Sequence, residues 1–342
     1  MSEVYYGNYL QLDKILKAQS PESQKSGQTA HDEMLFIITH QAYELWFKQM
    51  IHELSSIVEI FSQPKLNDNS PDVFTILHRL KRVAAIWELA IHQVDVIETM
   101  TPLDFLDFRE SLRPASGFQS YQFKMLEAIM GLKFDDRHGK IFFEQHLKSD
   151  DKAMIAKIEQ QPTLIELLNA WLERMPFFTP QYWPGIADSD KASDHPFWIE
   201  YLEAYKATLG MEDNEGFNTF KKVMFESNDG GRLSPEANRA ALFILLYRDY
   251  PILQIPFQLL DTLISIDDHM STWRTRHISL VRRMIGGRAG TGGSSGAHYL
   301  QESRDKHLIF NELASLNSFL IKRVNIPELP DDLIKRLGFQ VK

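Results

Sequence analysis

The chain contains no cysteine among its 342 residues. This absence excludes disulfide bonds, thiolate nucleophiles, iron–sulfur clusters and zinc sites built on cysteine. Any metal must therefore be bound by histidine or carboxylate side chains, or be carried within a cofactor.

Long hydrophobic runs are also absent. No stretch of about 18 apolar residues occurs, so the sequence predicts no transmembrane helix. The N-terminus lacks a basic segment followed by an apolar run, so no signal peptide is expected. The net charge of −9 does not suit nucleic-acid binding, which needs concentrated basic charge. We therefore expect a cytoplasmic protein that binds neither membranes nor nucleic acid.

Basic residues do gather at one place late in the chain. They suit either a solvated helix face or a local pocket for a ligand that carries carboxylates. The cluster comprises Arg274, Arg276, Arg282, Arg283 and Arg288.

Strand-like alternation of apolar and polar residues is almost absent, and apolar residues recur at helical spacing. Helices are predicted over residues 32–61, 73–100, 119–130, 163–174 and 195–209. Ser234 and Pro235 mark the start of another helix, and a helix of roughly 30 residues follows from near Pro251 to about Ile285. A C-terminal helix is expected after a Gly/Ser loop, whereas residues 176–194 and 211–232 look irregular.

These elements predict an all-α fold, with long core helices in one bundle. No repeat and no domain linker is evident, so residues 1–342 are expected to form a single domain. A smaller helical insertion is expected at about residues 135–210.

A di-iron centre is the natural metal site for a helical bundle rich in carboxylates. Such a centre needs Glu-x-x-His pairs on two helices, and this spacing does not occur in the chain. Glu44 is interpreted as an intrahelical partner at i,i+4 spacing, and the cluster Asp267, Asp268 and His269 is expected to be exposed.

Two of the 12 histidines stand out by position. His40 follows the apolar residues Phe36, Ile37 and Ile38, and His277 lies in the middle of the long late helix. A histidine in such a place can be a core residue bonded to a backbone carbonyl. It can also be a haem ligand, because neutral imidazole binds iron well.

Arg109 and the Gly/Ser loop are further candidates for ligand binding. Arg109 lies among aromatic residues and can pair with a carboxylate of either the protein or a ligand. The loop from Gly290 to Gly296 lacks the lysine of a P-loop and does not follow a strand, so a phosphate-binding motif is excluded. It can be a flexible connection, or it can wrap a different ligand, with Thr291 as a polar contact.

Several segments, taken together and in order, resemble the tryptophan 2,3-dioxygenase family. The resemblance covers most of the chain without a large gap. It rests on Tyr6–Leu10, His31–Gln49, Asp107–Arg109, Pro114–Gln119, Tyr247–Arg248, Pro256–Leu260, Trp273–His277 and Gly290–Gly296.

The resemblance implies a haem-dependent dioxygenase that opens the indole ring of L-tryptophan with O2 to give N-formyl-L-kynurenine, the first step of the kynurenine pathway. It implies b-type haem, ferrous in the active state, and a homotetramer built as a dimer of dimers. His277 matches the axial ligand of the haem iron, and Trp273, Gly290 and Gly292 match cofactor contacts.

The resemblance also implies the substrate contacts. Phe36 and Phe105 match the walls of the indole pocket, and Arg109 matches the group that binds the substrate carboxylate. The remaining implied contacts are Ile37, Ile38, Thr39, Thr291, Tyr6 and Tyr9. Residues 1–30, which carry the two tyrosines, are expected to dock on a neighbouring subunit.

His40 matches the residue that faces the indole nitrogen. Because an indole N–H is a very weak acid, we expect His40 to position the substrate by a hydrogen bond more than to act as an obligatory base. Ser111, Arg113 and Ala297 depart from the family pattern beside the predicted site. Two alternatives therefore stay open: a related haem enzyme that oxidises a modified indole, and a haem-binding sensor without catalysis.

Overall fold

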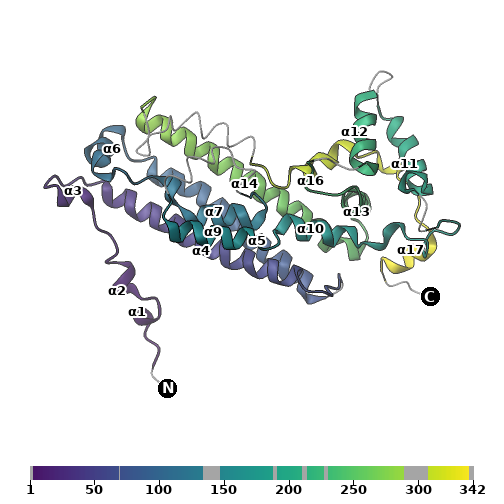
Figure 1. Cartoon of the computed structure of the whole chain (residues 1–342), viewed down its shortest axis with the longest axis horizontal. Coiled ribbons are helices and arrows are strands. Elements are labelled where there is room, and N and C mark those ends of the chain that lie inside the picture. Colours follow the sequence, from purple (N-terminus) through teal and green to yellow (C-terminus); the bar gives the residue numbers. More distant parts are fainter. Residues whose placement is uncertain are drawn as a thin grey trace.

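The computed structural model describes residues 3–68, 70–133, 147–187, 191–209, 214–226, 230–288 and 307–338. These residues form helices and connecting segments, with no strand anywhere in the described ranges, so the all-α prediction is confirmed. Long helices lie along the major axis of an elongated molecule, and shorter helices gather at one end (Figure 1).

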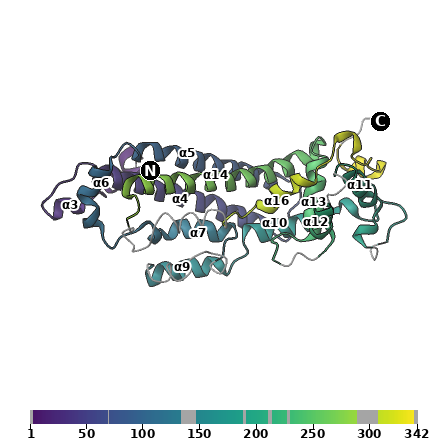
Figure 2. The ribbon, with the colours of Figure 1, turned by 90° about the horizontal axis from the view of Figure 1, so that it is seen from above.

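The bundle consists of α4 (Glu33–Phe61), α5 (Pro71–Ile97), α14 (Gln254–Ile285) and the shorter α7 (Tyr121–Met130), which run side by side (Figure 2). The sequence fixes the ends of these helices locally. Ser70 caps α5 by accepting a hydrogen bond from the Asp72 backbone N–H, with Pro71 in the first turn. Gly286, with φ of 59°, ends α14 in a conformation that favours glycine.

A short connection between α5 and α7 carries α6 (Pro102–Arg109) and two 3₁₀ turns, η1 (Glu110–Leu112) and η2 (Gly117–Gln119). Thr101 and Asp104 form a capping box at the start of α6, because each side chain bonds the backbone N–H of the other. Ser116 and Gln119 repeat this arrangement at η2. These caps give a short segment a defined start even though few of its residues are buried.

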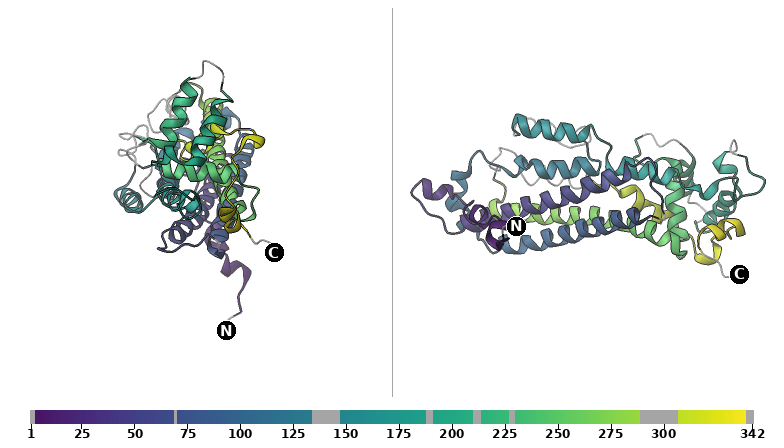
Figure 3. Two further views of the ribbon diagram at one scale, coloured as in Figure 1. Left: turned by 90° about the vertical axis from the view of Figure 1, so that its right-hand side faces the viewer. Right: turned by 90° about the horizontal axis from the view of Figure 1, so that it is seen from below.

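The helices at the other end of the molecule surround an aromatic core and continue the main apolar cluster. Seen from below, α9 lies outside the bundle on the far side of α7 (Figure 3). Helix α9 spans Ser149–Glu159. The elements at the other end are α10 (Leu164–Glu173), η4 (Pro176–Phe178), η5 (Ala192–Asp194), α11 (Pro196–Lys206), α12 (Asn214–Phe225), α13 (Pro235–Leu246), η6 (Pro251–Leu253), α16 (Asn311–Ser315), η7 (Leu316–Phe319), η8 (Arg323–Asn325) and α17 (Asp331–Arg336).

One expectation from the sequence is wrong in this region. Residues 211–232 are not irregular, because they contain the helix α12, which buries Phe220 and Met224 on one face. The apolar spacing of Phe217, Phe220 and Met224 carries this signal, but polar residues separate them and obscure it. The C-terminal helix expected after the Gly/Ser loop begins outside the described residues, and residues 307–338, which contain Pro327 and Pro330, form only short turns of helix. None of the described helices is long and apolar enough to cross a membrane.

The N-terminal residues form an arm that leaves the body of the molecule (Figures 1 and 3). It carries the short helices α1 (Tyr6–Tyr9), α2 (Leu12–Ile15) and α3 (Glu22–Lys25). Large apolar side chains of the arm are in water: Val4, Tyr5, Tyr6, Tyr9 and Leu16 are each at least 70% exposed. Isolated chains rarely expose such a continuous apolar segment unless another surface covers it.

A buried ion network joins α7 to α14. The Glu127 carboxylate accepts from Arg274 at 2.9 Å and from Lys124 at 3.1 Å, and all three side chains are buried. The backbone carbonyl of His307 accepts a hydrogen bond from Arg274 at 3.4 Å, so the network also holds the segment that begins at residue 307.

Asp267 holds the same segment from α14. Its carboxylate accepts backbone N–H bonds from Ile309, at 2.8 Å, and from Phe310, at 2.5 Å. The expectation that Asp267 is exposed is therefore wrong, since only 4% of its surface is accessible. Burial raises the pKa of Asp267 to about 6, against the opposing effect of the two N–H bonds.

We predict that Glu127→Gln destabilises the protein by about 3–5 kcal/mol, because the substitution removes the negative charge that faces the buried Arg274 guanidinium. Urea unfolding of the two proteins measures the difference. The control is Glu22→Gln, which removes an exposed ion pair to Lys25 and should cost less than about 1 kcal/mol. Equal effects of the two substitutions would contradict a structural role for the network.

Candidate functional site

His40 lies on α4, two turns after the start of the helix. Its Nδ1 lies 2.7 Å from the Phe36 carbonyl oxygen. A carbonyl only accepts, so Nδ1 carries the proton in the neutral ring, and Nε2 is left as a hydrogen-bond acceptor. The ring keeps accessible surface, yet the surrounding protein lowers the pKa of His40 because burial disfavours the charged form.

His277 lies on α14 and is partly buried. Its ring stacks on Trp273, one turn earlier, with ring centroids 5.3 Å apart and planes 10° from parallel. Burial lowers the pKa of His277 to about 4, and the nearby His40 lowers it further. The ring is therefore neutral at physiological pH, and within the described part of the chain neither nitrogen makes a hydrogen bond.

The two histidines come from distant parts of the sequence, and the fold brings them within electrostatic range of each other. His195 is also buried, but its surroundings are different. Its Nδ1 accepts from the Phe197 backbone N–H at 3.2 Å and caps α11, while Trp183 and Phe178 pack edge-on against the ring. His195 is thus explained as a helix cap, whereas His277 has no such structural partner.

Helix α6 supplies an aromatic wall next to His40. The centroid of the Phe36 ring lies 4.1 Å from that of the His40 ring, 5.8 Å from that of Phe105 and 5.6 Å from that of Phe108. Phe108 is fully buried and meets Phe105 edge to face at 5.3 Å. These rings belong to a second apolar cluster, which also contains Leu280 and Met284 of α14. Phe108 was not predicted as a site residue, although its three-residue spacing from Phe105 indicates a shared helix face.

Arg109 ends α6 and is buried, with only 4% of its surface accessible. The Glu110 carboxylate lies 3.6 Å from Nη1 of Arg109, and the Glu110 side chain is largely exposed. Arg109 is thus a buried guanidinium at the end of the helix that carries Phe105, and a guanidinium is a group that can bind a planar carboxylate by two parallel hydrogen bonds.

The other predicted contacts are only partly brought together. Ile38 is 49% exposed, and Thr39 is buried with its carbonyl bonded to Gln93, so neither side chain joins Phe36 and His40. Ile37, which precedes Ile38 in the chain, is partly buried.

The remaining predictions concern the arm and the Gly/Ser loop. Tyr6 and Tyr9 lie on the arm, away from the site of the same chain. Thr291, Gly290 and Gly292 lie outside the described residues.

The late arginines do not form one solvated face. Arg274 is buried in the Glu127 network, and Arg276 pairs with Asp95 at 2.7 Å and with Glu98 at 3.0 Å. Of the two interpretations of this cluster, the solvated helix face does not hold for Arg274, because the side chain is buried and pairs with a carboxylate on α7.

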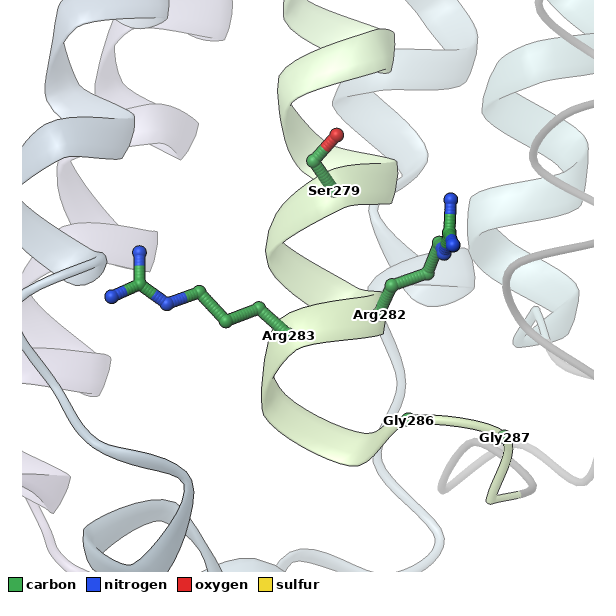
Figure 4. A pocket seen from close by; sticks show the side chains of 5 residues that line it. All are labelled: Ser279, Arg282, Arg283, Gly286 and Gly287. Carbon is green, nitrogen blue, oxygen red and sulfur yellow. The ribbon is translucent and has the colours of Figure 1, made fainter.

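Two further arginines border a hollow of about 620 Å³ beside the end of α14 (Figure 4). Arg282 and Arg283 point to opposite sides of the helix there. The lining residues are Ser279, Arg282, Arg283, Gly286 and Gly287. Helical spacing places Ser279 and Arg282 on a different stripe of α14 from His277, so the hollow does not share the face that carries the imidazole.

No group of three or more histidine or acidic side chains in the described part of the chain could hold a metal ion. The donor set around His277 therefore does not suit a metal bound by the protein alone. A single neutral imidazole, aromatic walls and an arginine instead fit a metal that arrives within a planar macrocycle, for which one protein nitrogen is enough.

The chain is similar to known proteins over nearly its whole length. The sequence pattern of a family described as "Tryptophan 2,3-dioxygenase" matches residues 1–320. The chain is 41% identical to a tryptophan 2,3-dioxygenase of Alteromonas mediterranea, over 99% of this chain and 98% of the relative. It is 40% identical to one of Bdellovibrio bacteriovorus, over 98% of each, and 41% identical to one of Mus musculus, over 95% of this chain and 84% of the relative.

The buried cap His195 gives a pH-dependent prediction. Burial lowers the pKa of His195 to about 4, while an unfolded histidine titrates near 6.5. Above pH 6.5 the ring is neutral in both states. As the pH falls from 6.5 to 4 only the unfolded chain takes up the proton, so stability is lost.

His195→Asn keeps a capping acceptor and removes this titration. Over that pH interval it should therefore reduce the loss of unfolding free energy by about 3 kcal/mol. Urea unfolding at several pH values measures the free energy of unfolding of both proteins. If it changed with pH equally in the variant and the wild type, the burial of a neutral His195 ring would be contradicted.

Proposed function

The chain belongs to the tryptophan 2,3-dioxygenase family, and we propose that it cleaves the C2–C3 bond of the indole ring of L-tryptophan. It is an oxidoreductase that uses O2, and both oxygen atoms enter the product, N-formyl-L-kynurenine. The observation that carries the proposal is the pair of neutral histidines, His40 and His277, on two helices of one bundle. Neither a modified indole nor a sensor without catalysis is favoured over this activity.

We propose that b-type haem binds with His277 as the axial ligand of its iron. The ring is neutral, has no hydrogen-bond partner among the described residues and is oriented by stacking on Trp273. When bound, the haem would supply the ferrous iron that activates dioxygen. Gly290 and Gly292 remain proposed cofactor contacts.

The substrate side of the site would be formed by α4 and α6. An indole packed against the rings of Phe36 and Phe105 would bury an apolar face, as aromatic rings prefer. Arg109 would bind the carboxylate of the amino acid, and Thr291 the amino-acid end. Holding the substrate at two points fixes the orientation of the indole, which is a large part of what a protein contributes to such a reaction.

His40 would then accept a hydrogen bond from the indole N–H. The Phe36 carbonyl holds the proton on Nδ1 and leaves Nε2 with a lone pair. This tautomer is the one that can accept from a donor such as indole, and it requires no proton transfer. The proposed role of His40 is accordingly to position the substrate.

The arm is proposed to complete the site of a neighbouring chain. Its exposed tyrosines, Tyr6 and Tyr9, do not reach the site of their own chain, and the arm buries almost none of its apolar surface. A homotetramer arranged as a dimer of dimers, located in the cytoplasm, is the assembly we propose.

The activity is tested with purified protein supplemented with haem and reduced. Adding L-tryptophan in air should give the absorbance of N-formyl-kynurenine, and the reduced protein should show a Soret band. His277→Ala should lose stoichiometric haem, whereas the matched variant His195→Asn should keep it. A protein that stays colourless with excess haem, or a His277→Ala variant with normal haem content, would refute the proposal.

The role of His40 is tested separately. His40→Ala should raise KM for L-tryptophan about tenfold, corresponding to the loss of one hydrogen bond, and should leave measurable turnover. Steady-state kinetics at saturating O2 give both constants. Complete loss of kcat with unchanged substrate affinity would show instead that His40 is an essential base.

A further inference from the structure

A buried carboxylate near the site has no role in the function proposed above. Glu33 stands in the first turn of α4, and none of its surface is accessible. Its Oε1 accepts the Glu22 backbone N–H at 2.7 Å, and its Oε2 accepts the Ser23 backbone N–H at 2.9 Å. Both oxygens therefore bind the first turn of α3, and the carboxylate ties the arm to the start of α4.

The Ser23 hydroxyl links the same turn of α3 to the residues that lead into α4. It accepts the Ala30 backbone N–H at 3.1 Å, and Ser23 is 1% exposed. Ala30 packs against the second apolar cluster, which contains Phe108 and contacts Phe105. The turn from α3 to α4 is thus fixed by three hydrogen bonds, all directed at backbone donors.

Glu33 lies on the same face of α4 as Phe36 and His40. Glu33, Phe36 and His40 are spaced by three and four residues, which places them in one row on the helix. Helix α3 lies against α6 and η1 at this end of the molecule (Figure 1). Helix α6 carries Phe105 and ends at Arg109. The element held by Glu33 therefore supports the helix that would bind the substrate carboxylate.

We propose that Glu33 is a positioning residue for substrate binding. Its carboxylate keeps α3 seated on α6, and α6 keeps Arg109 and Phe105 in register with His40 and Phe36. This inference rests on the proposed function, because it assumes that Arg109 and Phe105 contact the substrate. A carboxylate is required at this position because it offers two acceptors to two buried donors.

The test is Glu33→Gln in the haem-loaded protein. The amide has the size of the carboxylate but offers one acceptor oxygen, and its NH2 group would face the second backbone N–H. We expect KM for L-tryptophan to rise about tenfold, with kcat changed less than about threefold and with normal haem content, because α6 shifts while His277 does not. Glu33→Asp keeps both acceptors on a shorter side chain and should recover part of the affinity.

The matched control is Glu166→Gln. Glu166 also accepts a backbone N–H at a helix start, from Thr163 at 2.8 Å, but it lies on α10, away from the site. Glu166→Gln removes the ion pair with Lys133 and keeps an acceptor for the Thr163 N–H, so it should lower the melting temperature slightly without changing KM. A Glu33→Gln protein that behaves in the same way, less stable but with the KM of the wild type, would overturn the proposal.

Two further outcomes are separable. If the unmodified protein bound haem but did not turn over L-tryptophan, the proposed function would fail before Glu33 was tested. If Glu33→Gln did not fold, Ser23→Ala would remove one hydrogen bond of the same turn and should raise KM about twofold, with kcat retained. An unchanged KM in a folded Ser23→Ala protein would then overturn the inference.

Discussion

Four helices of the bundle meet at the ring of Trp273. The indole contacts Tyr43 and Phe47 of α4, Trp87 of α5 and Phe123 of α7, at centroid distances between 5.3 and 6.3 Å. Its other neighbour is His277, on which it stacks. Because aromatic packing of this kind is close and directional, the position of the imidazole is set by the core and not by the surface. The packing of the bundle therefore determines the position of the His277 ring in the candidate site.

Much of this arrangement could be predicted from the sequence, for physical reasons. The long helices follow from apolar periodicity, and their starts at Ser70 and Ser234 follow from capping. His40, His277 and Arg109 were predicted as site residues because a resemblance gave weight to residues that periodicity alone could not rank, and their roles stay predictions. Helix α12 was missed because its apolar residues are few, and its partners lie elsewhere in the chain.

Buried charge was the least predictable feature. Asp267 stands beside Asp268 and His269 and reads as a polar surface cluster, but its carboxylate binds two backbone N–H groups inside the protein. Glu33 and Glu127 are similar cases, since each is buried by partners that lie on other elements. Local sequence shows that a residue is ionisable, whereas its partners depend on how distant segments pack.

The N-terminal arm exposes apolar surface that only another chain could cover. Tyr5, Tyr6 and Tyr9 leave apolar surface in water, so covering that surface releases free energy that a single chain cannot gain alone. Free energy gained between chains follows mass action, and it grows with protein concentration. The core would then fold within one chain at any concentration, whereas the order of the arm would depend on the concentration of the protein. In the proposed assembly, dilution would uncover the arm and favour its disorder, whereas Glu33 holds the chain at Glu22 and Ser23 within one subunit.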